Sequence, residues 1–304
     1  MTHSTSKSTS NHSDIDIFID TIWMEGGLAK NTLSAYRSDL LTLEKWAKNK
    51  KLSLQKISRA DLLDFISERA KSGSSSRSSA RQLSTYRRFY NYLAQQEIIV
   101  HNPTLKISMP KIGRPLPKII SEEDVVKLIK APMAKKPLGC RDRAMLELLY
   151  ATGLRVSELV QLKQTQINLN QGFIRVVGKG NKERLVPFGD FAERWLKRYL
   201  KGPIHEILGE RRTDYLFPTN TSEYISRQAF WQLIKKYAKK SGLTSDLSPH
   251  TLRHAFATHL INHDADLRVV QMLLGHSDLS TTQIYTHIAQ QRLKDLHEKH
   301  HPRG

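Results

Sequence analysis

A proline-rich stretch divides the sequence and limits what it can fold into. Between His101 and Ile120 there are four prolines, four basic residues and no acidic residue. Proline breaks a helix and removes a hydrogen bond from a strand, so no regular element can run through this stretch. We therefore predict a basic linker over residues 101–120, between two domains. A length of 304 residues fits this division.

The segment before the linker has the pattern of a helical domain, which we assign to residues 15–100. Apolar residues from Leu33 to Ala47 recur every three or four positions, the spacing of one helix face. Ser58 and Asp61 form a capping-box pattern that starts a second helix. A third helix is expected where four large side chains share one face: Leu83, Tyr86, Tyr90 and Leu93.

The segment after the linker, residues 121–304, is predicted to be mostly helical with a small antiparallel sheet. Ser248 can cap a helix whose first position is Pro249. Short β-type runs at 173–177 and 184–186 flank the turn-rich sequence Gly-Lys-Gly-Asn, which predicts a hairpin. The fold class is therefore mainly α.

The charge balance indicates a polyanionic partner. The chain has 48 Lys and Arg against 29 Asp and Glu, a net charge of +19. Such an excess favours nucleic acid, with an anionic membrane surface as the second candidate.

Cysteine content and the lack of targeting segments indicate the compartment. Cys140 is the single cysteine, so neither a disulfide framework nor a cysteine-based zinc site is possible, and its neighbours match no nucleophile pattern. No apolar run is long enough for a transmembrane helix. Residues 1–14 are polar and lack the apolar core of a signal peptide, so we expect a disordered lead-in. We expect a cytoplasmic, nucleoid-associated protein.

Basic residues before and within the linker could contact phosphates. Arg77, Arg81 and Arg88 fall within ~40° of each other at about 100° per residue on the third helix. Such a stripe is often only a solvated face, but the overall charge favours DNA contact. The same role is predicted for the linker cations Lys111, Arg114 and Lys118.

Three groups in the second domain could carry chemistry. Arg155 follows Gly153-Leu154, His250 and Arg253 are three apart, and Tyr285 follows His276 by nine residues. Residues three apart share a helix face. His250 lies in the first turn, where free N–H groups and the helix dipole favour an anion.

Each group also has an ordinary structural reading. Arg155 could pair with Glu158 on a helix surface, and Tyr285 could be a core aromatic. Two histidine pairs have metal-ligand spacing without the glutamate of a zinc motif, so we predict no metal site: His250 with His254, and His259 with His263.

In their order along the chain, six residues resemble the catalytic set of the tyrosine recombinase (phage integrase) family: Arg155, Lys179, His250, Arg253, His276 and Tyr285. Single matches are common by chance, whereas six in order are specific. Leu-Leu-Gly-His ending at His276 and Thr-Thr-Gln-Ile-Tyr-Thr-His around Tyr285 fit the family pattern too.

The resemblance extends over nearly the whole chain. It implies a SAM-like core-binding domain followed by a catalytic domain of the DNA breaking–rejoining fold. Residues 253–259 and 267–276 follow the pattern of the bacterial Xer chromosome-dimer resolvases. These resolvases act as a pair: a XerC-type member and a second member that an FtsK-type translocase activates. The ending, residues 300–304, is more similar to that of the second member.

The resemblance also implies a role for each residue. Tyr285 is the nucleophile that forms a 3′-phosphotyrosyl link, and no cofactor is needed because one phosphoester replaces another. Arginines and His276 stabilise charge on the nonbridging oxygens, and His250 is the base or hydrogen-bonding partner of the tyrosine. Lys179 protonates the leaving 5′-oxygen, with Lys182 as a competing candidate, and Glu158 orients a catalytic group.

The implied partners are a double-stranded DNA recombination site, a XerC-type recombinase in a heterotetramer, and an FtsK-type DNA translocase as activator. A C-terminal segment, about Gln290–Gly304, would dock on the neighbouring subunit. Two other functions stay open on the sequence. They are a type IB topoisomerase-like relaxing enzyme and a non-catalytic DNA-binding protein.

Overall fold

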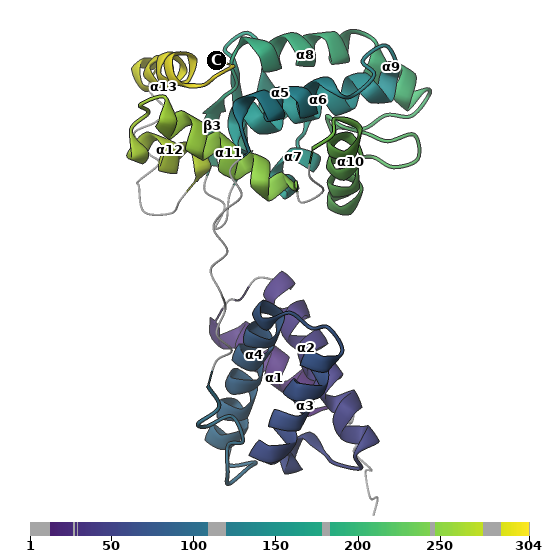
Figure 1. Ribbon diagram of the computed structural model, residues 1–304, viewed down its shortest axis with the longest axis vertical. Coiled ribbons are helices and arrows are strands. Elements are labelled where there is room, and N and C mark those ends of the chain that lie inside the picture. The colour runs from purple at the N-terminus through teal and green to yellow at the C-terminus, as the bar shows by residue number, and fades with distance from the viewer. Residues whose placement is uncertain are drawn as a thin grey trace, which may run out of the picture. The chain divides into compact units, whose positions relative to one another are not determined.

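The computed structural model describes residues 13–26, 28, 30–108, 120–177, 183–243, 247–275 and 287–303. Within these ranges the chain is mainly helical with a small antiparallel sheet, which confirms the predicted fold class. The chain divides into two compact units, Met1–Leu116 and Pro117–Gly304 (Figure 1). No helix within the described ranges is long and apolar enough to cross a membrane.

The first unit is a helical domain with an aromatic core. Its elements are α1 (Asp14–Gly26), α2 (Lys30–Asn49), the 3-10 turn η1 (Leu54–Lys56), α3 (Arg59–Lys71) and α4 (Ser76–Gln95). Ser58 caps α3 through reciprocal bonds with Asp61, as predicted. The predicted apolar face of α4 is fully buried: Leu83, Tyr86, Tyr90 and Leu93.

A buried carboxylate links α2 to α4 in this unit. Asp39 is only 3% exposed and accepts hydrogen bonds from both terminal nitrogens of Arg81. The hydroxyl of Thr85 donates a third bond to Asp39, at 3.0 Å. Because a buried carboxylate is costly unless it is paired, these bonds hold the two helices in register.

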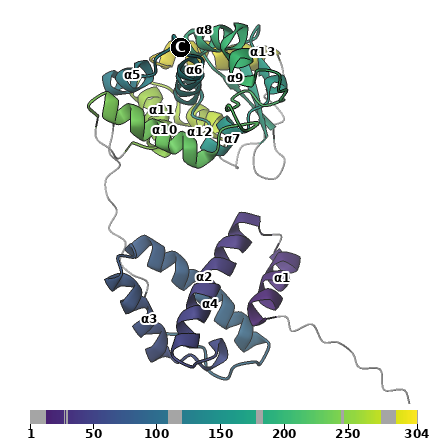
Figure 2. The same ribbon diagram turned by 90° about the vertical axis from the view of Figure 1, so that its right-hand side faces the viewer.

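The second unit surrounds one buried helix, α6. Every residue of α6 from Gly139 to Thr152 is buried. Helices α5, α8, α9 and α11 pack against it, and Figure 2 shows it enclosed by the others. The elements are α5 (Glu122–Lys130), α6 (Pro137–Thr152), α7 (Val156–Val160), the 3-10 turn η2 (Gln164–Gln166), β1 (Ile167–Asn168), β2 (Phe173–Val177), β3 (Glu183–Pro187), α8 (Asp190–Lys201), α9 (Pro203–Leu208), α10 (Arg227–Lys240), α11 (Pro249–Asn262), α12 (Leu267–Leu274) and α13 (His287–His300).

The sheet contains the predicted hairpin and one short strand that the sequence did not predict. Strands β2 and β3 pair antiparallel, with Arg175 opposite Leu185, and β1 extends the sheet on the other side of β2. Ser248 caps α11 and Pro249 occupies its first turn, as predicted. These elements place β3, α11 and α12 beside the end of α6.

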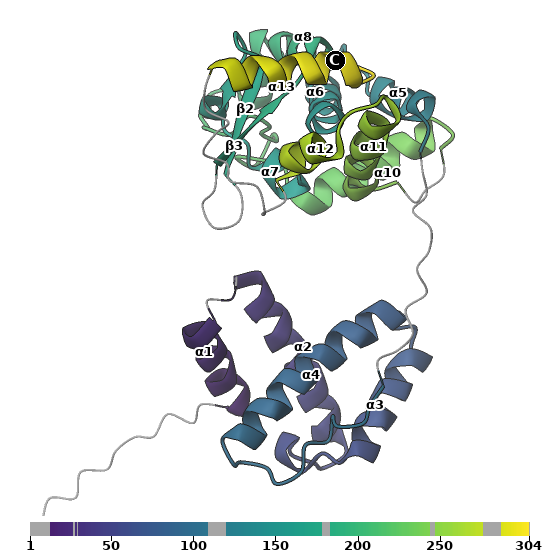
Figure 3. The same cartoon turned by 90° about the vertical axis from the view of Figure 1, so that its left-hand side faces the viewer.

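The C-terminal segment packs on α6 of its own chain (Figure 3). His297 Nε2 lies 2.6 Å from the carbonyl oxygen of Ala151, and His301 Nε2 lies 3.1 Å from that of Tyr150. Arg303 forms two hydrogen bonds with the buried carboxylate of Glu147, at 2.9 and 2.7 Å. The two imidazoles thus bind carbonyl groups that a helix end leaves without helical partners.

Burial keeps both tail imidazoles neutral. It lowers the pKa of His297 to about 4 and that of His301 well below its ordinary value. The neighbouring charged or titratable groups are His259, Tyr150 and Arg303. Because the unfolded tail takes up protons below pH ~6.5 and the docked tail does not, docking weakens as the pH falls from about 6.5 to about 4.

We expect acid to release the tail. The pKa shift of His297 alone corresponds to a loss of about 3 kcal/mol of docking free energy at pH 4. Hydrogen exchange of residues 294–303, corrected for intrinsic rates, should show protection at pH 7 that is lost near pH 4.5. His297→Gln keeps an N–H donor for Ala151 without titrating, so it should lose less protection. Equal protection of the wild type at both pH values would contradict the assignment.

Candidate active site

The end of α6 presents Arg155. The helix stops at Gly153, whose φ of +57° is in the left-handed region, and a Cβ there would collide with the ring of Phe256. Arg155 then caps the short helix α7, and its backbone N–H donates to Glu158 Oε2 at 2.7 Å. The guanidinium also bonds Glu158, at 2.9 Å, yet its side chain stays 44% exposed. One edge of this cation is anchored while the rest can meet a ligand.

Arg253 reaches the same place from α11. Its two terminal nitrogens donate to the carbonyl oxygens of Gly153 and Leu274, the latter at 2.7 Å. Burial, together with the positive charge of Arg155, lowers the pKa of Arg253 to about 10, although Glu158 opposes the shift. The arginine remains charged at neutral pH, but it lacks enough counter-charge. A phosphate between the two guanidiniums would supply it.

His250 lies one turn before Arg253. It is exposed in the first turn of α11, directly after the Ser248 cap and Pro249. Because residues three apart share a helix face, His250 and Arg253 project from one face of α11 near its N-terminus.

A buried arginine that the sequence analysis did not single out connects the site. Arg184 of β3 is 5% exposed and donates to both carboxylate oxygens of Glu158, at 3.1 and 2.9 Å. Burial alone would raise the pKa of Glu158, but hydrogen bonds and charge from Arg184, with help from Arg155, hold it below its ordinary value. Glu158 is therefore a fixed anion shared by two arginines.

Arg184 also contacts the turn that leads to position 276. Its Nε donates to the carbonyl of Leu273 at 3.2 Å. Gly275, in the left-handed region with φ +69°, packs so closely that a Cβ would crowd the Arg184 guanidinium. Strand alternation could have indicated that Arg184 points inward, because Arg184 and the buried Val186 are two apart and share a face.

Four of the predicted residues, together with part of the linker, lie outside the described residues. They are Lys179, Lys182, His276 and Tyr285, and the linker cations are Lys111, Arg114 and Lys118. Their roles stay predictions. The structure nevertheless describes residues next to the ends of the segments that contain them, at Val177, Glu183, Gly275 and His287.

The other candidates have structural partners. His259 is held between the hydroxyl of Tyr150 and the carbonyl of Ile120. No group of three possible metal ligands occurs within the described part of the chain. Cys140 is buried, which raises the pKa of its thiol and keeps it protonated at neutral pH.

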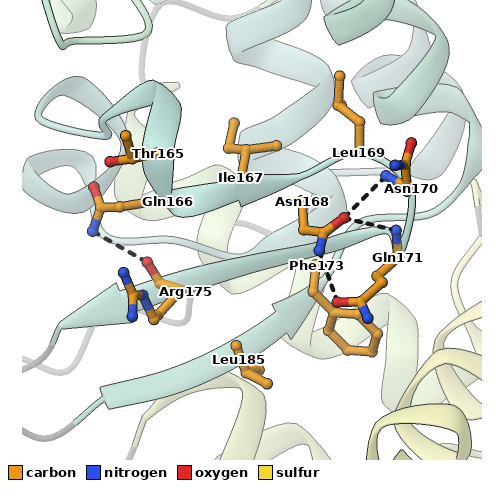
Figure 4. Close-up of a pocket in the computed structure, with 10 residues that line it drawn as sticks. All are labelled: Thr165, Gln166, Ile167, Asn168, Leu169, Asn170, Gln171, Phe173, Arg175 and Leu185. Carbon is orange, nitrogen blue, oxygen red and sulfur yellow. Dashed lines mark hydrogen bonds between the residues drawn. The ribbon is translucent and has the colours of Figure 1, made fainter.

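A cavity of about 560 Å³ lies on the sheet, and its lining includes none of the catalytic candidates that the structure describes, Arg155, His250 and Arg253 (Figure 4). Asn168, one of its lining residues, bonds the Gln171 side chain and accepts hydrogen bonds from the backbone N–H groups of Asn170 and Gln171. Its lining contains no acidic residue, histidine, cysteine or tyrosine, so these residues give it no nucleophile–base pair.

The basic stripe on α4 has two kinds of member. Arg77 is exposed, and Arg88 lies over the ring of Tyr36 at 5.9 Å. Arg81, in contrast, is held in two hydrogen bonds by Asp39. Contact with DNA stays a prediction for all three, and Arg81 has a structural task besides.

Comparison with known proteins gives a consistent result. Residues 118–292 match the model of the phage integrase family, and residues 15–97 match that of its N-terminal SAM-like domain. The first match spans more than half of the chain. The chain belongs to the phage integrase family.

Two relatives and one structure illustrate its position in the phage integrase family. The chain is 55% identical to the tyrosine recombinase XerD of Pseudomonas aeruginosa, over 98% of this chain and 100% of that protein. It is 53% identical to XerD of Shewanella oneidensis, over 95% and 97%. A crystal structure of XerH site-specific recombinase bound to palindromic difH substrate matches with a TM-score of 0.68 and 25% identity, over 93% and 83%. The resemblance seen in the motifs is thus confirmed, and the chain is a tyrosine site-specific recombinase.

We expect Arg184→Ala to slow DNA cleavage about a hundredfold, the scale of a 1 Å displacement in an active site. Removal of Arg184 frees Glu158, and with it Arg155 and the turn at Gly275. The dissociation constant for DNA should change little, which separates a positioning role from loss of binding. Arg175→Gln on the exposed side of β2 is the matched control and should cleave normally. Normal cleavage by Arg184→Ala would contradict the assignment.

Arg81 and Arg77 should respond differently to the same substitution. Arg81→Gln leaves Asp39 without its cation, which should cost about 2 kcal/mol of stability in the first unit. Urea unfolding with hydrogen exchange in α2 and α4 measures this. Arg77→Gln should leave stability unchanged and lower the slope of log K against log salt by about 1. The reverse pattern would reject this division of roles.

Proposed function

We propose that this recombinase exchanges strands between two specific DNA sites together with a XerC-type partner. It does so in a heterotetramer that resolves chromosome dimers at cell division. The relatives named XerD and the ending at residues 300–304 support this reading. An FtsK-type translocase activates it, and the reaction takes place on the nucleoid, in the cytoplasm. The XerH structure contains bound difH substrate, which supports a DNA recombination site as the ligand.

The observation that carries the chemistry is the pair of arginines at the end of α6. Arg155 and Arg253 approach each other from two helices, and burial together with the positive charge of Arg155 lowers the pKa of Arg253, so this site would favour a bound anion. A scissile phosphodiester supplies that charge. Because guanidiniums bind oxyanions through paired N–H groups, the two arginines stabilise the negative charge that builds up on the nonbridging oxygens.

The other predicted residues complete the reaction. Tyr285 attacks phosphorus to form a 3′-phosphotyrosyl link, and the 5′-hydroxyl leaves with a proton from Lys179. His250 assists the tyrosine, whose ordinary pKa is ~10, and His276 adds a donor to the phosphate. A 5′-hydroxyl from the second site then attacks the link and releases Tyr285. Each step exchanges one phosphoester for another, so the chemistry needs no cofactor.

The C-terminal tail supplies the coupling between subunits. In this chain the tail lies on α6, at the carbonyls that precede Gly153 and Arg155. If the same tail docks on a neighbouring subunit, it binds the end of the helix that presents the catalytic arginine there. Tail exchange therefore links the active sites of adjacent subunits.

The test is covalent trapping on a nicked recombination site, with and without the XerC-type partner. We expect an SDS-resistant protein–DNA adduct that maps to Tyr285 at a 3′-phosphate. Tyr285→Phe should abolish it, and Tyr215→Phe, a tyrosine outside the site, should not. An adduct that survives Tyr285→Phe would place the nucleophile elsewhere. Tight DNA binding without any adduct, even with partner and translocase, would leave a DNA-binding role. Relaxation of DNA without a specific site would indicate a topoisomerase.

A further inference from the structure

The second unit has a concave cationic site on α8 that the reaction does not use. Its cavity has a volume of about 420 Å³ and is formed by α5, α6, α8 and the C-terminal segment. Five cations and two aromatic rings line it: Lys130, Arg143, Arg194, Arg198 and Arg303, with Phe191 and Trp195.

Each of the two rings lies close to two guanidiniums. Arg303 lies 4.1 Å and Arg194 5.4 Å from the ring centre of Phe191. Arg143 and Arg198 lie 4.9 and 5.0 Å from that of Trp195. A guanidinium held over a ring face can still use its edge N–H groups. Those of Arg143 and Arg303 bond Glu147, and Arg198 gives one N–H to the carbonyl of Ala134 at 3.4 Å.

The site has too little negative charge for its cations. The buried carboxylate of Glu147 serves both Arg143 and Arg303. Among the described residues, the three exposed cations Lys130, Arg194 and Arg198 form no ion pair. Burial, which Glu147 only partly offsets, lowers the pKa of Arg143. An anionic ligand would restore the balance.

The position of the site argues against DNA as that ligand. The three ribbon views, which turn about one vertical axis, keep α8 at the upper edge of the unit and α7 at the lower edge (Figures 1–3). DNA bound at Arg155 and Arg253 therefore lies on the other side of α6. A cavity of this size admits side chains rather than the backbone of a duplex, and its rings favour an apolar group beside the charge.

We propose that this pocket binds an acidic segment of a partner protein, with carboxylates at Arg194 and Arg198 and an apolar side chain over Phe191 and Trp195. Paired N–H groups match carboxylates, and the rings bury the apolar neighbour. Because Arg303 forms one wall, the ligand binds the form with a docked tail, and tail release weakens binding. The site is independent of the strand-exchange chemistry.

The probe is a labelled, N-acetylated Glu-Asp-Leu-Phe-Glu-Asp peptide, compared with a peptide in which Gln and Asn replace the acidic residues. Fluorescence polarisation at low salt measures affinity for the full chain. The emission of Trp195 reports occupancy, with Trp195→Phe identifying its signal. We expect the neutral peptide to bind at least about tenfold more weakly.

A matched pair of variants separates the pocket from the general positive charge of the chain. Arg194→Glu with Arg198→Glu and Lys201→Glu with Lys239→Glu change the net charge equally, at exposed positions. The first should lose about tenfold in affinity, and the second should stay close to wild type. If the charge reversal prevents folding, Arg194→Gln with Arg198→Gln tests the same point. Both pocket variants should still cleave a nicked recombination site, so failure here is distinct from failure of the proposed function.

Four outcomes would overturn the proposal. The neutral peptide could bind as tightly as the acidic one, or both charge-reversed variants could lose affinity equally. Duplex DNA without a recombination site could displace the peptide and itself require Arg194 and Arg198, which would make the pocket a nucleic-acid surface. Self-association of the chain could depend on the same two residues, which would make the occupant a second copy.

Discussion

The ion pair between Glu158 and Arg184 is the interaction on which the active site depends. It joins α7 to β3 in the interior, and Arg184 also holds the last turn of α12 through the carbonyl of Leu273. A buried pair of this kind adds little net stability, because desolvation offsets its attraction. The ion pair instead fixes the geometry of the site, because two parallel hydrogen bonds set both the angle and the distance between the two side chains. Two elements distant in sequence, β3 and α12, are thereby held against Arg155 and α7 in one arrangement.

Helix α6 also carries charged side chains that are paired inside the core. It is buried on all sides, yet it carries Arg141, Asp142, Arg143 and Glu147. Asp142 is satisfied by Arg141 and by the hydroxyl of Tyr237, and Glu147 by Arg143 and Arg303. The C-terminal tail thus completes a charge network inside the domain, and the same helix ends just before Arg155, which we propose binds the scissile phosphate. Helix α6 therefore connects the contacts of the C-terminal tail with those of Arg155.

Features set by residues close together in the sequence could be predicted, whereas contacts between distant residues could not. Caps at Ser58 and Ser248 and the buried face of α4 follow from spacing alone, because a helix repeats every 3.6 residues. The pairing of Arg155 with Glu158 could also be predicted, because the two residues are only three positions apart. Arg184, by contrast, finds its partner 26 positions away, and no local pattern specifies that distance. The burial of His297 and His301 could not be predicted either, because a polar, histidine-rich ending gives no sign of burial.

The positive charge of the chain is organised rather than uniform. Arg81, Arg184 and Arg303 each pair with a buried carboxylate and serve the fold. Arg155 pairs with Glu158, which also serves Arg184, whereas Arg253 bonds two backbone carbonyls, so positive charge stays unbalanced at the end of α6. Preorganised cations of this kind cost stability in the free protein, and a bound oxyanion recovers that cost. The net charge of +19 indicates a polyanionic partner, and the carboxylates beside each arginine separate the paired cations from those whose charge is unbalanced.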